Sequence, residues 1–183
     1  MNETDKKIIL NLINTYGIKE LDTIIELYKE LINYYNERDQ FNSTKCYFEN
    51  NTNQIITNGR SSVIHLNERI IDFEILKSKE LKEIPKSVEK ETIEEYIETG
   101  KRYLGDAIMK VSLSNDRGFI FYKNIKEETC QISLNEYKLI KLLLKNPIMY
   151  SSIRNSVIYF ESEKGHAYVL TNNIDNHRGH LIF

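Results

Sequence analysis

The stretch TCQISLNEYKLIKLLLKNP, residues 129–147, changes from one kind of secondary structure to another. Residues up to Ser133 suit a β-strand. After Ser133, the apolar side chains recur at helical spacing. Ser133 has the side chain that helix N-caps prefer, and Pro147 cannot continue a helix. We therefore predict a strand over Thr129–Ser133, followed directly by a helix over Asn135–Lys145.

Residues 41–76 contain β-branched and aromatic residues in partial alternation, separated by Asn-rich turns. The segments KCYFEN, NQIITNG, SSVIHL and RIIDFEIL predict two to four strands of an antiparallel meander. Asn58-Gly59 is typical of a two-residue hairpin turn. Strands are therefore expected both within residues 41–76 and at Thr129–Ser133.

The first forty residues are predicted to form a helical hairpin. A first helix should end at Gly17, and a second should run from about Ile18 to Arg38. The second helix carries two adjacent apolar rows, which make a broader stripe than packing against one short helix requires. Either it lies under a sheet of its own chain, or it also pairs with a second copy or with a partner. A homodimer through residues 18–38 is therefore one expectation.

Residues 77–102 carry 14 charged side chains in 26 positions, with Lys and Glu interspersed. We interpret this segment as a charged linker or solvated helix, with Ser87 as the cap of a helix over Val88–Thr99. It divides the chain into a helical hairpin plus meander (residues 1–76) and a β-rich half with one helix (residues 103–183). The alternative is that these two parts form a single domain.

The last eighty residues are predicted to contain further strands. They are Ala107–Leu113, Phe119–Tyr122, Val157–Glu161 and His166–Thr171, with turns at residues 115–118 and 163–165. The predicted fold class is α+β: an N-terminal helical hairpin followed by antiparallel β-sheet regions with one or two packed helices.

Composition favours a protein of the cytoplasm. The N-terminal sequence MNETDKKIILNLIN is polar, and no apolar run exceeds four residues, so neither a signal peptide nor a membrane span is predicted. Cys46 and Cys130 are too few for a zinc or disulfide framework and are expected to be reduced thiols. No cofactor is expected.

Part of the C-terminal half resembles a DNA-binding domain. The run ETCQISLNEYKLIKLLLKNPIMYSS followed by KGHAYVL resembles the winged-helix domain of bacterial response regulators over Ile120–Leu170. The resemblance implies a strand, a leucine-rich helix ending at Asn-Pro and a wing hairpin. Only residues 152–155 would remain for the recognition helix, which is too few. The alternative function is a nucleic-acid-binding regulator that uses the mildly basic C-terminal half and dimerises through residues 18–38.

Three of the four histidines lie near the C-terminus: His166, His177 and His180. A metal-dependent hydrolase that uses them is a third hypothesis, although polar residues at strand ends are the simpler interpretation. Arg178 and Lys164, together with these histidines, could meet a phosphate or carboxylate group.

The leading prediction is a small non-enzymatic protein that binds another macromolecule, with a protein as the expected partner. The chain has twelve tyrosines, which suit interfaces, and among them we single out Tyr28, Tyr35 and Tyr159 as candidate contact residues. No catalytic motif is found. The abundance of Ile, Asn, Lys and Tyr indicates an AT-rich genome, and by analogy predicts a phage or mobile-element inhibitor of a host defence complex.

Overall fold

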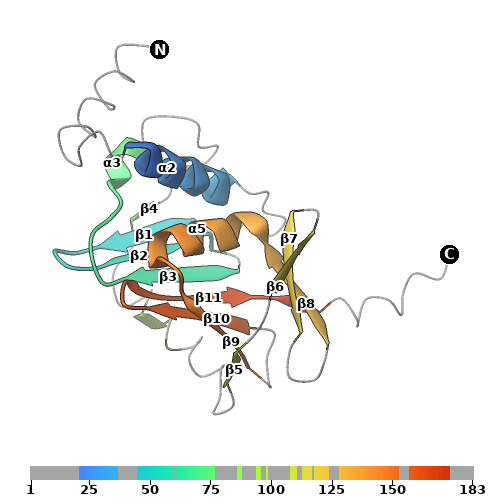
Figure 1. Cartoon of the computed structure of the whole chain (residues 1–183). Coiled ribbons are helices and arrows are strands. Elements are labelled where there is room, and N and C mark those ends of the chain that lie inside the picture. Colours follow the sequence, from blue (N-terminus) through green and yellow to red (C-terminus); the bar gives the residue numbers. More distant parts are fainter. Residues whose placement is uncertain are drawn as a thin grey trace.

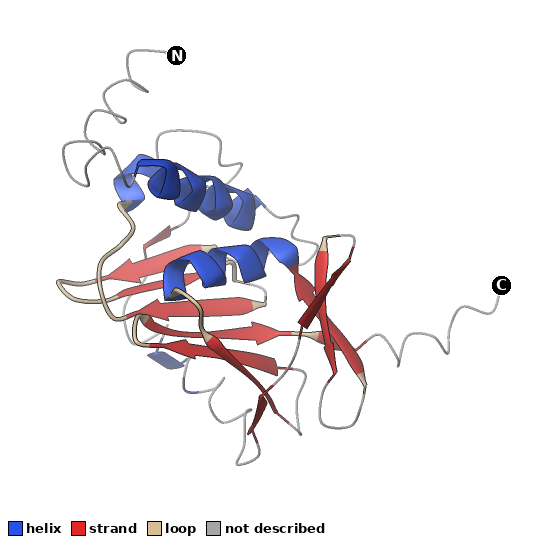
Figure 2. Ribbon diagram, viewed as in Figure 1, coloured by secondary structure: helices blue, strands red, loops and turns tan. Residues whose placement is uncertain are grey.

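A computed structural model describes the following residues of the chain: 21–36, 45–59, 61–76, 86–87, 94–95, 98, 108–110, 113–116, 118–123, 128–152 and 157–173. Two helices lie on one face of a large sheet, and a smaller sheet stands beside them (Figure 1; Figure 2). This arrangement confirms the predicted α+β class. The first helix of the predicted hairpin and most of Val88–Thr99 lie outside the described residues.

The large sheet has the strand order β4-β1-β2-β3-β11-β10-β9-β5. All neighbouring strands are antiparallel except β4, which runs parallel to β1. The strands of this sheet are β1 (Cys46–Glu49), β2 (Gln54–Thr57), β3 (Ser62–Leu66), β4 (Lys86–Ser87), β5 (Ile108–Lys110), β9 (Ile148–Ser152), β10 (Val157–Ser162) and β11 (Gly165–Leu170).

Strands β3 and β11 join the N-terminal and C-terminal parts of the chain. Ile64 pairs with Ala167, and His65 pairs with His166. One sheet and one core therefore contain strands from residues 1–76 and from residues 103–183.

The small sheet has the order β12-β8-β7-β6. Its strands are β6 (Leu113–Asp116), β7 (Phe119–Lys123), β8 (Thr129–Ser133) and β12 (Asn172–Asn173). One face of β7 and β8 is buried through Ile120, Tyr122 and Ile132. Strand β8 leads directly into helix α5, which begins at the next residue.

The helices are α2 (Leu21–Asn36), α3 (Phe73–Leu76) and α5 (Leu134–Leu144). The predicted cap of α5 is confirmed, because the Ser133 hydroxyl accepts a hydrogen bond of 3.2 Å from the amide of Asn135. Lys145 and Asn146 adopt positive φ angles of 50° and 61° at the other end of α5, just before Pro147. The helix therefore starts and stops where local sequence signals place it.

The core lies between the two longer helices and the large sheet. The buried residues of α2 are Leu27, Tyr28, Leu31, Tyr34 and Tyr35. Three of these belong to the predicted apolar rows, whereas Ile25 and Ile32 from the same rows are only half-buried. The predicted stripe therefore packs mainly within its own chain, and the homodimer through residues 18–38 stays a prediction.

Two buried tyrosines tie α2 to the sheet through their hydroxyl groups. The Tyr35 hydroxyl donates to the Cys46 carbonyl at 3.2 Å. Tyr34 lies 2.9 Å from the Ser62 hydroxyl and accepts from the amide of Asn58 at 2.8 Å. Burial raises the pKa of both phenols well above 10.

The meander has three strands, β1, β2 and β3, within the predicted range of two to four. The fourth segment, RIIDFEIL, adds no strand, and its residues Phe73–Leu76 form helix α3. The reason is that β3 already pairs with β2 on one edge and with β11 on the other. Residues after Leu66 therefore have no free edge of β3 to join.

Two predictions need correction. Asn58-Gly59 is part of a four-residue connection over residues 58–61, because the Asn58 side chain accepts from the amides of Ser61 and Ser62. Ala107–Leu113 is not one strand, since β5 and β6 belong to different sheets. Ser87 pairs with Tyr47 in the sheet, and the start of the helix that it was predicted to cap lies outside the described residues. Strand β9 was not predicted.

No helix among the described residues is long and apolar enough to cross a membrane.

Candidate functional site

A cleft of about 470 Å³ lies between helix α2, the end of helix α5 and two loops of the large sheet. We call it the helix cleft. It is lined by Thr23, Ile24, Leu27, Tyr28, Glu68, Arg69, Ile70, Leu142, Leu143, Lys145 and Lys164. Two residues predicted to bind a partner, Tyr28 and Lys164, are therefore brought together here from positions far apart in the sequence.

The floor of the helix cleft is apolar. Ile24 and Leu27 come from one face of α2, and Leu142 and Leu143 come from the last turn of α5. Leu27 and Leu143 are buried, whereas Ile24 and Leu142 are half-buried. A bound molecule could therefore cover more of the exposed surface of Ile24 and Leu142.

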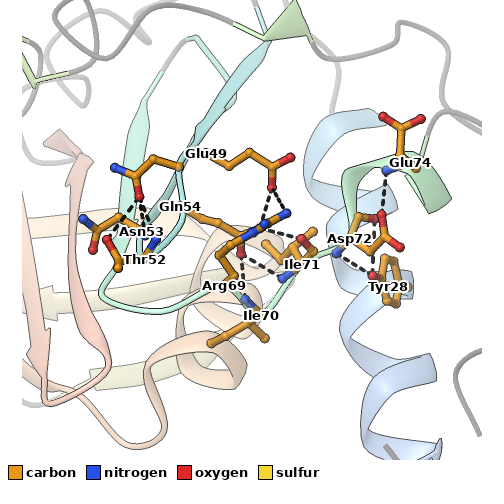
Figure 3. A network of polar contacts seen from close by, with 11 residues as sticks. Tyr28, Glu49, Thr52, Asn53, Gln54, Arg69, Ile70, Ile71, Asp72 and Glu74 are labelled. Atoms are coloured by element: carbon orange, nitrogen blue, oxygen red, sulfur yellow. Dashed lines mark hydrogen bonds and ion pairs between the residues drawn. The ribbon is translucent and has the colours of Figure 1, made fainter. Parts of the chain in front are cut away.

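One wall of the cleft is a loop held by the buried side chain of Gln54 (Figure 3). The Gln54 side-chain oxygen accepts hydrogen bonds of 2.8 Å from the amides of both Ile70 and Ile71. Its nitrogen donates to the Ile71 carbonyl and, at 3.1 Å, to Glu49. A single side chain thus satisfies three backbone groups of a segment that is not in any sheet.

The same wall is tied to α2 through Tyr28 (Figure 3). The Tyr28 hydroxyl accepts from the amide of Asp72 at 2.9 Å and donates to the Asp72 carbonyl at 3.3 Å. The Asp72 carboxylate in turn accepts from the amide of Glu74 at the start of α3. Tyr28 is therefore a positioning residue of the cleft, with its hydroxyl engaged by the backbone.

The β10–β11 turn contributes to the cleft beside the start of the same loop. The Asn67 amide donates to the Lys164 carbonyl at 2.9 Å, and the Lys164 ammonium group lies 2.5 Å from Glu68. Gly165 has φ +146°, and a Cβ atom there would lie 2.0 Å from the His65 carbonyl oxygen. The β10–β11 turn and the end of strand β3 can approach this closely only because residue 165 is glycine.

The remaining predicted site residues lie elsewhere. Tyr35 is fully buried in the core. Tyr159 and His166 lie on the face of the large sheet opposite α2 and α5, with ring centroids 6.0 Å apart. His177, Arg178 and His180 lie outside the described residues, so their relation to Lys164 and His166 stays a prediction.

Tyr159 and His166 belong to a row of aromatic rings across neighbouring strands. The centroids of Tyr159 and Tyr168 are 4.8 Å apart, and those of His166 and His65 are also 4.8 Å apart. Burial raises the pKa of both Tyr159 and Tyr168. Within the segments that the structure describes, no three His, Cys, Asp or Glu side chains are grouped in a way that could hold a metal ion.

A buried carboxylate connects α5 to the β2–β3 connection. Glu136 accepts a hydrogen bond of 2.9 Å from the Asn58 side-chain amide and another from the Ser61 hydroxyl. Only 3% of Glu136 is exposed. It does not line the helix cleft, and its contacts fix the helix on the sheet.

Sequence reasoning missed Gln54, Arg69 and Lys145 as parts of the site. Gln54 had one signal, because it is a polar residue at the start of the fully buried strand QIIT. Arg69 and Lys145 had no such signal in the sequence. They line the cleft only because the β3–α3 loop and the end of α5 come together there. Comparison of the chain with protein-family models, with curated proteins and with solved structures finds no match.

Proposed function

We propose that this chain is a non-enzymatic binding protein that holds a segment of a partner protein in the helix cleft. The observation that carries the proposal is the apolar floor of a cleft of about 470 Å³, which is within the usual range for binding pockets. Ile24 and Leu142 are half-buried there and lose further exposed surface when an apolar side chain lies on them.

The walls of the cleft support the same proposal. Gln54 and Tyr28 hold the loop wall by hydrogen bonds to its backbone, and Asn67, at the start of that loop, ties it to the β10–β11 turn. A site whose walls are already ordered loses little conformational entropy when it binds. The cleft therefore suits recognition of a defined segment.

The test selects random peptides displayed on phage against the immobilised full-length chain and measures the affinity of synthetic copies. Ile24→Gln should weaken the selected peptides about fivefold, because covering half of an isoleucine side chain contributes about 1 kcal/mol. Ile25→Gln is the matched control. Ile25 is the next residue of α2 and is also half-buried, but it does not line the cleft.

Equal loss of affinity in the two variants, or no loss in either, would contradict binding in the helix cleft. Thermal melts of both variants show whether they are comparably folded. A loss confined to Ile24→Gln supports the proposal.

Nucleic-acid binding is a second candidate, and the small sheet favours it. Phe119 is 41% exposed, its ring centroid lies 6.4 Å from that of Phe121, and Lys123 follows on the same face of β7. Exposed aromatic rings beside a cation are the platform on which unpaired bases stack. Titration of a fluorescent oligothymidine at low salt tests it. Binding that Phe119→Ala weakens would support it, and no binding would exclude this surface.

The narrower prediction, an inhibitor of a host defence complex encoded by a phage or mobile element, remains a hypothesis based on composition. The cytoplasmic location and the homodimer are also still proposals. Light scattering tests the homodimer, because a monomer has a mass of 21.6 kDa.

A further inference from the structure

The charged residues around the helix cleft are mostly cations. Four of the lining residues are charged: Arg69, Lys145 and Lys164 are positive and Glu68 is negative. Three positive charges less one negative give a net charge of +2, whereas the whole chain has a net charge of −2. Counting also Glu49, which pairs with Arg69, leaves a net charge of +1, so the rim of the cleft is positive on a molecule that is negative overall.

The three cations come from three different parts of the fold. Arg69 lies in the β3–α3 loop, Lys164 in the β10–β11 turn, and Lys145 at the end of α5. Lys145 has a left-handed backbone, and its amide donates to the Lys141 carbonyl at 3.1 Å. The C-terminal carbonyls of α5 carry a partial negative charge of about −0.5, which reduces the positive charge of the rim without reversing it.

Two of the cations are already in ion pairs that exchange easily. Arg69 lies 3.2 Å from Glu49, and Lys164 lies 2.5 Å from Glu68. The four side chains are between 31% and 52% exposed, and exposed pairs of this kind contribute little to stability. Among the residues that the structure describes, Lys145 has no carboxylate partner.

We propose that the segment held in the helix cleft is acidic: an apolar side chain lies on Ile24 and Leu142, and flanking Asp or Glu side chains contact Lys145, Lys164 and Arg69. This inference rests on the proposed function. The apolar floor argues against a nucleic-acid backbone as the occupant, because phosphates would leave Ile24 and Leu142 uncovered. A protein segment supplies both kinds of group.

The first test is the composition of the peptides that the full-length chain selects from a random library. Asp and Glu should be enriched beside an apolar residue. The best peptide is then compared with a copy in which Asp and Glu are replaced by Asn and Gln. The acidic peptide should bind more tightly, and raising NaCl from about 50 mM to about 500 mM should reduce that difference.

The second test reverses one charge on the rim. Lys145→Glu should weaken the acidic peptide about five- to tenfold and should leave the neutral copy within about twofold. Lys141→Glu is the matched control. Lys141 is exposed on the last turn of the same helix but does not line the cleft. Both changes place a carboxylate near the same helix terminus, so their effects on folding are comparable.

The outcomes separate the two proposals. If Ile24→Gln weakens binding but Lys145→Glu does not, the segment binds in the cleft without needing acidic groups, and this inference is wrong. If Lys145→Glu and Lys141→Glu weaken binding equally, the effect is general electrostatic attraction, and the inference is also wrong. If neither Ile24→Gln nor Lys145→Glu has an effect, the proposed function itself fails.

Discussion

Replacing Gln54 with leucine should destabilise the protein and loosen the wall of the helix cleft. Leucine is close to glutamine in volume, so the change removes hydrogen bonds with little change in packing. The amides of Ile70 and Ile71 lose their acceptor, and the Ile71 carbonyl loses a donor. Because Ile71 is only 3% exposed, water cannot easily take over these roles.

The expected loss of stability follows from these groups. A buried polar group without a partner costs about 1–3 kcal/mol. Two to three such groups, less about 1–2 kcal/mol gained by burying an apolar side chain, give a net loss of about 2–4 kcal/mol. With a typical dependence of about 2 kcal/mol per molar urea, the unfolding midpoint should fall by about 1–2 M.

Urea unfolding followed by circular dichroism measures this loss, and Gln131→Leu is the control. Gln131 is half-buried in β8 of the small sheet, outside the polar network of the wall. Its replacement should change stability by less than about 1 kcal/mol. The reasoning is refuted if Gln54→Leu is as stable as Gln131→Leu, because the wall would then be held by something other than this amide.

Three further predictions concern single positions. Gly165→Ala should lose at least about 2 kcal/mol of unfolding free energy, because its Cβ would collide with the His65 backbone. Gly118→Ala, at φ +83° with open space around it, should lose about 1 kcal/mol, and equal losses in urea titrations would refute the steric explanation. Ser133→Ala should cost about 1 kcal/mol, measured as a lower Tm, because the α5 N-cap is lost; an unchanged Tm would show that the cap contributes nothing. Burial raises the pKa of Tyr34 above its unfolded value. The part of the unfolding free energy that depends on neutral Tyr34 should therefore be fully present below pH 10 and should be lost as pH rises further. Absorbance of ionised tyrosine in alkaline titrations should therefore show a fraction that appears only with unfolding, and ionisation of all twelve near pH 10 in a folded chain would contradict this.

The sequence predicted elements best where the controlling contacts are local. Helix α5 begins at the residue after Ser133, whose hydroxyl accepts a hydrogen bond from the amide of Asn135, and it ends before Pro147. Strand β8 was predicted at its observed bounds, and β10 and β11 were each within one residue. All these signals lie within a few positions of the element that they control.

The helix cleft could not be predicted because its parts lie far apart in the chain. Its lining comes from α2, the β3–α3 loop, the end of α5 and the β10–β11 turn. Tyr28 and Lys164 were singled out for separate reasons, as a tyrosine and as a neighbour of histidines, and no pattern in the sequence joined them. Their proximity depends on the pairing of β3 with β11, which brings the two loops to the same end of the sheet.

The absence of a fourth meander strand at RIIDFEIL and the existence of the helix cleft have one cause. A fourth meander strand needs the outer edge of β3, and β11 occupies that edge. The amides of Ile70 and Ile71 must then find acceptors outside a sheet, and Gln54 provides them from the buried strand β2. Because that amide holds the chain away from the sheet, residues 68–70 stand beside α2 and form a wall. A polar residue such as Gln54 in a buried strand therefore indicates that a loop is held nearby. Only the strand order shows which loop it is.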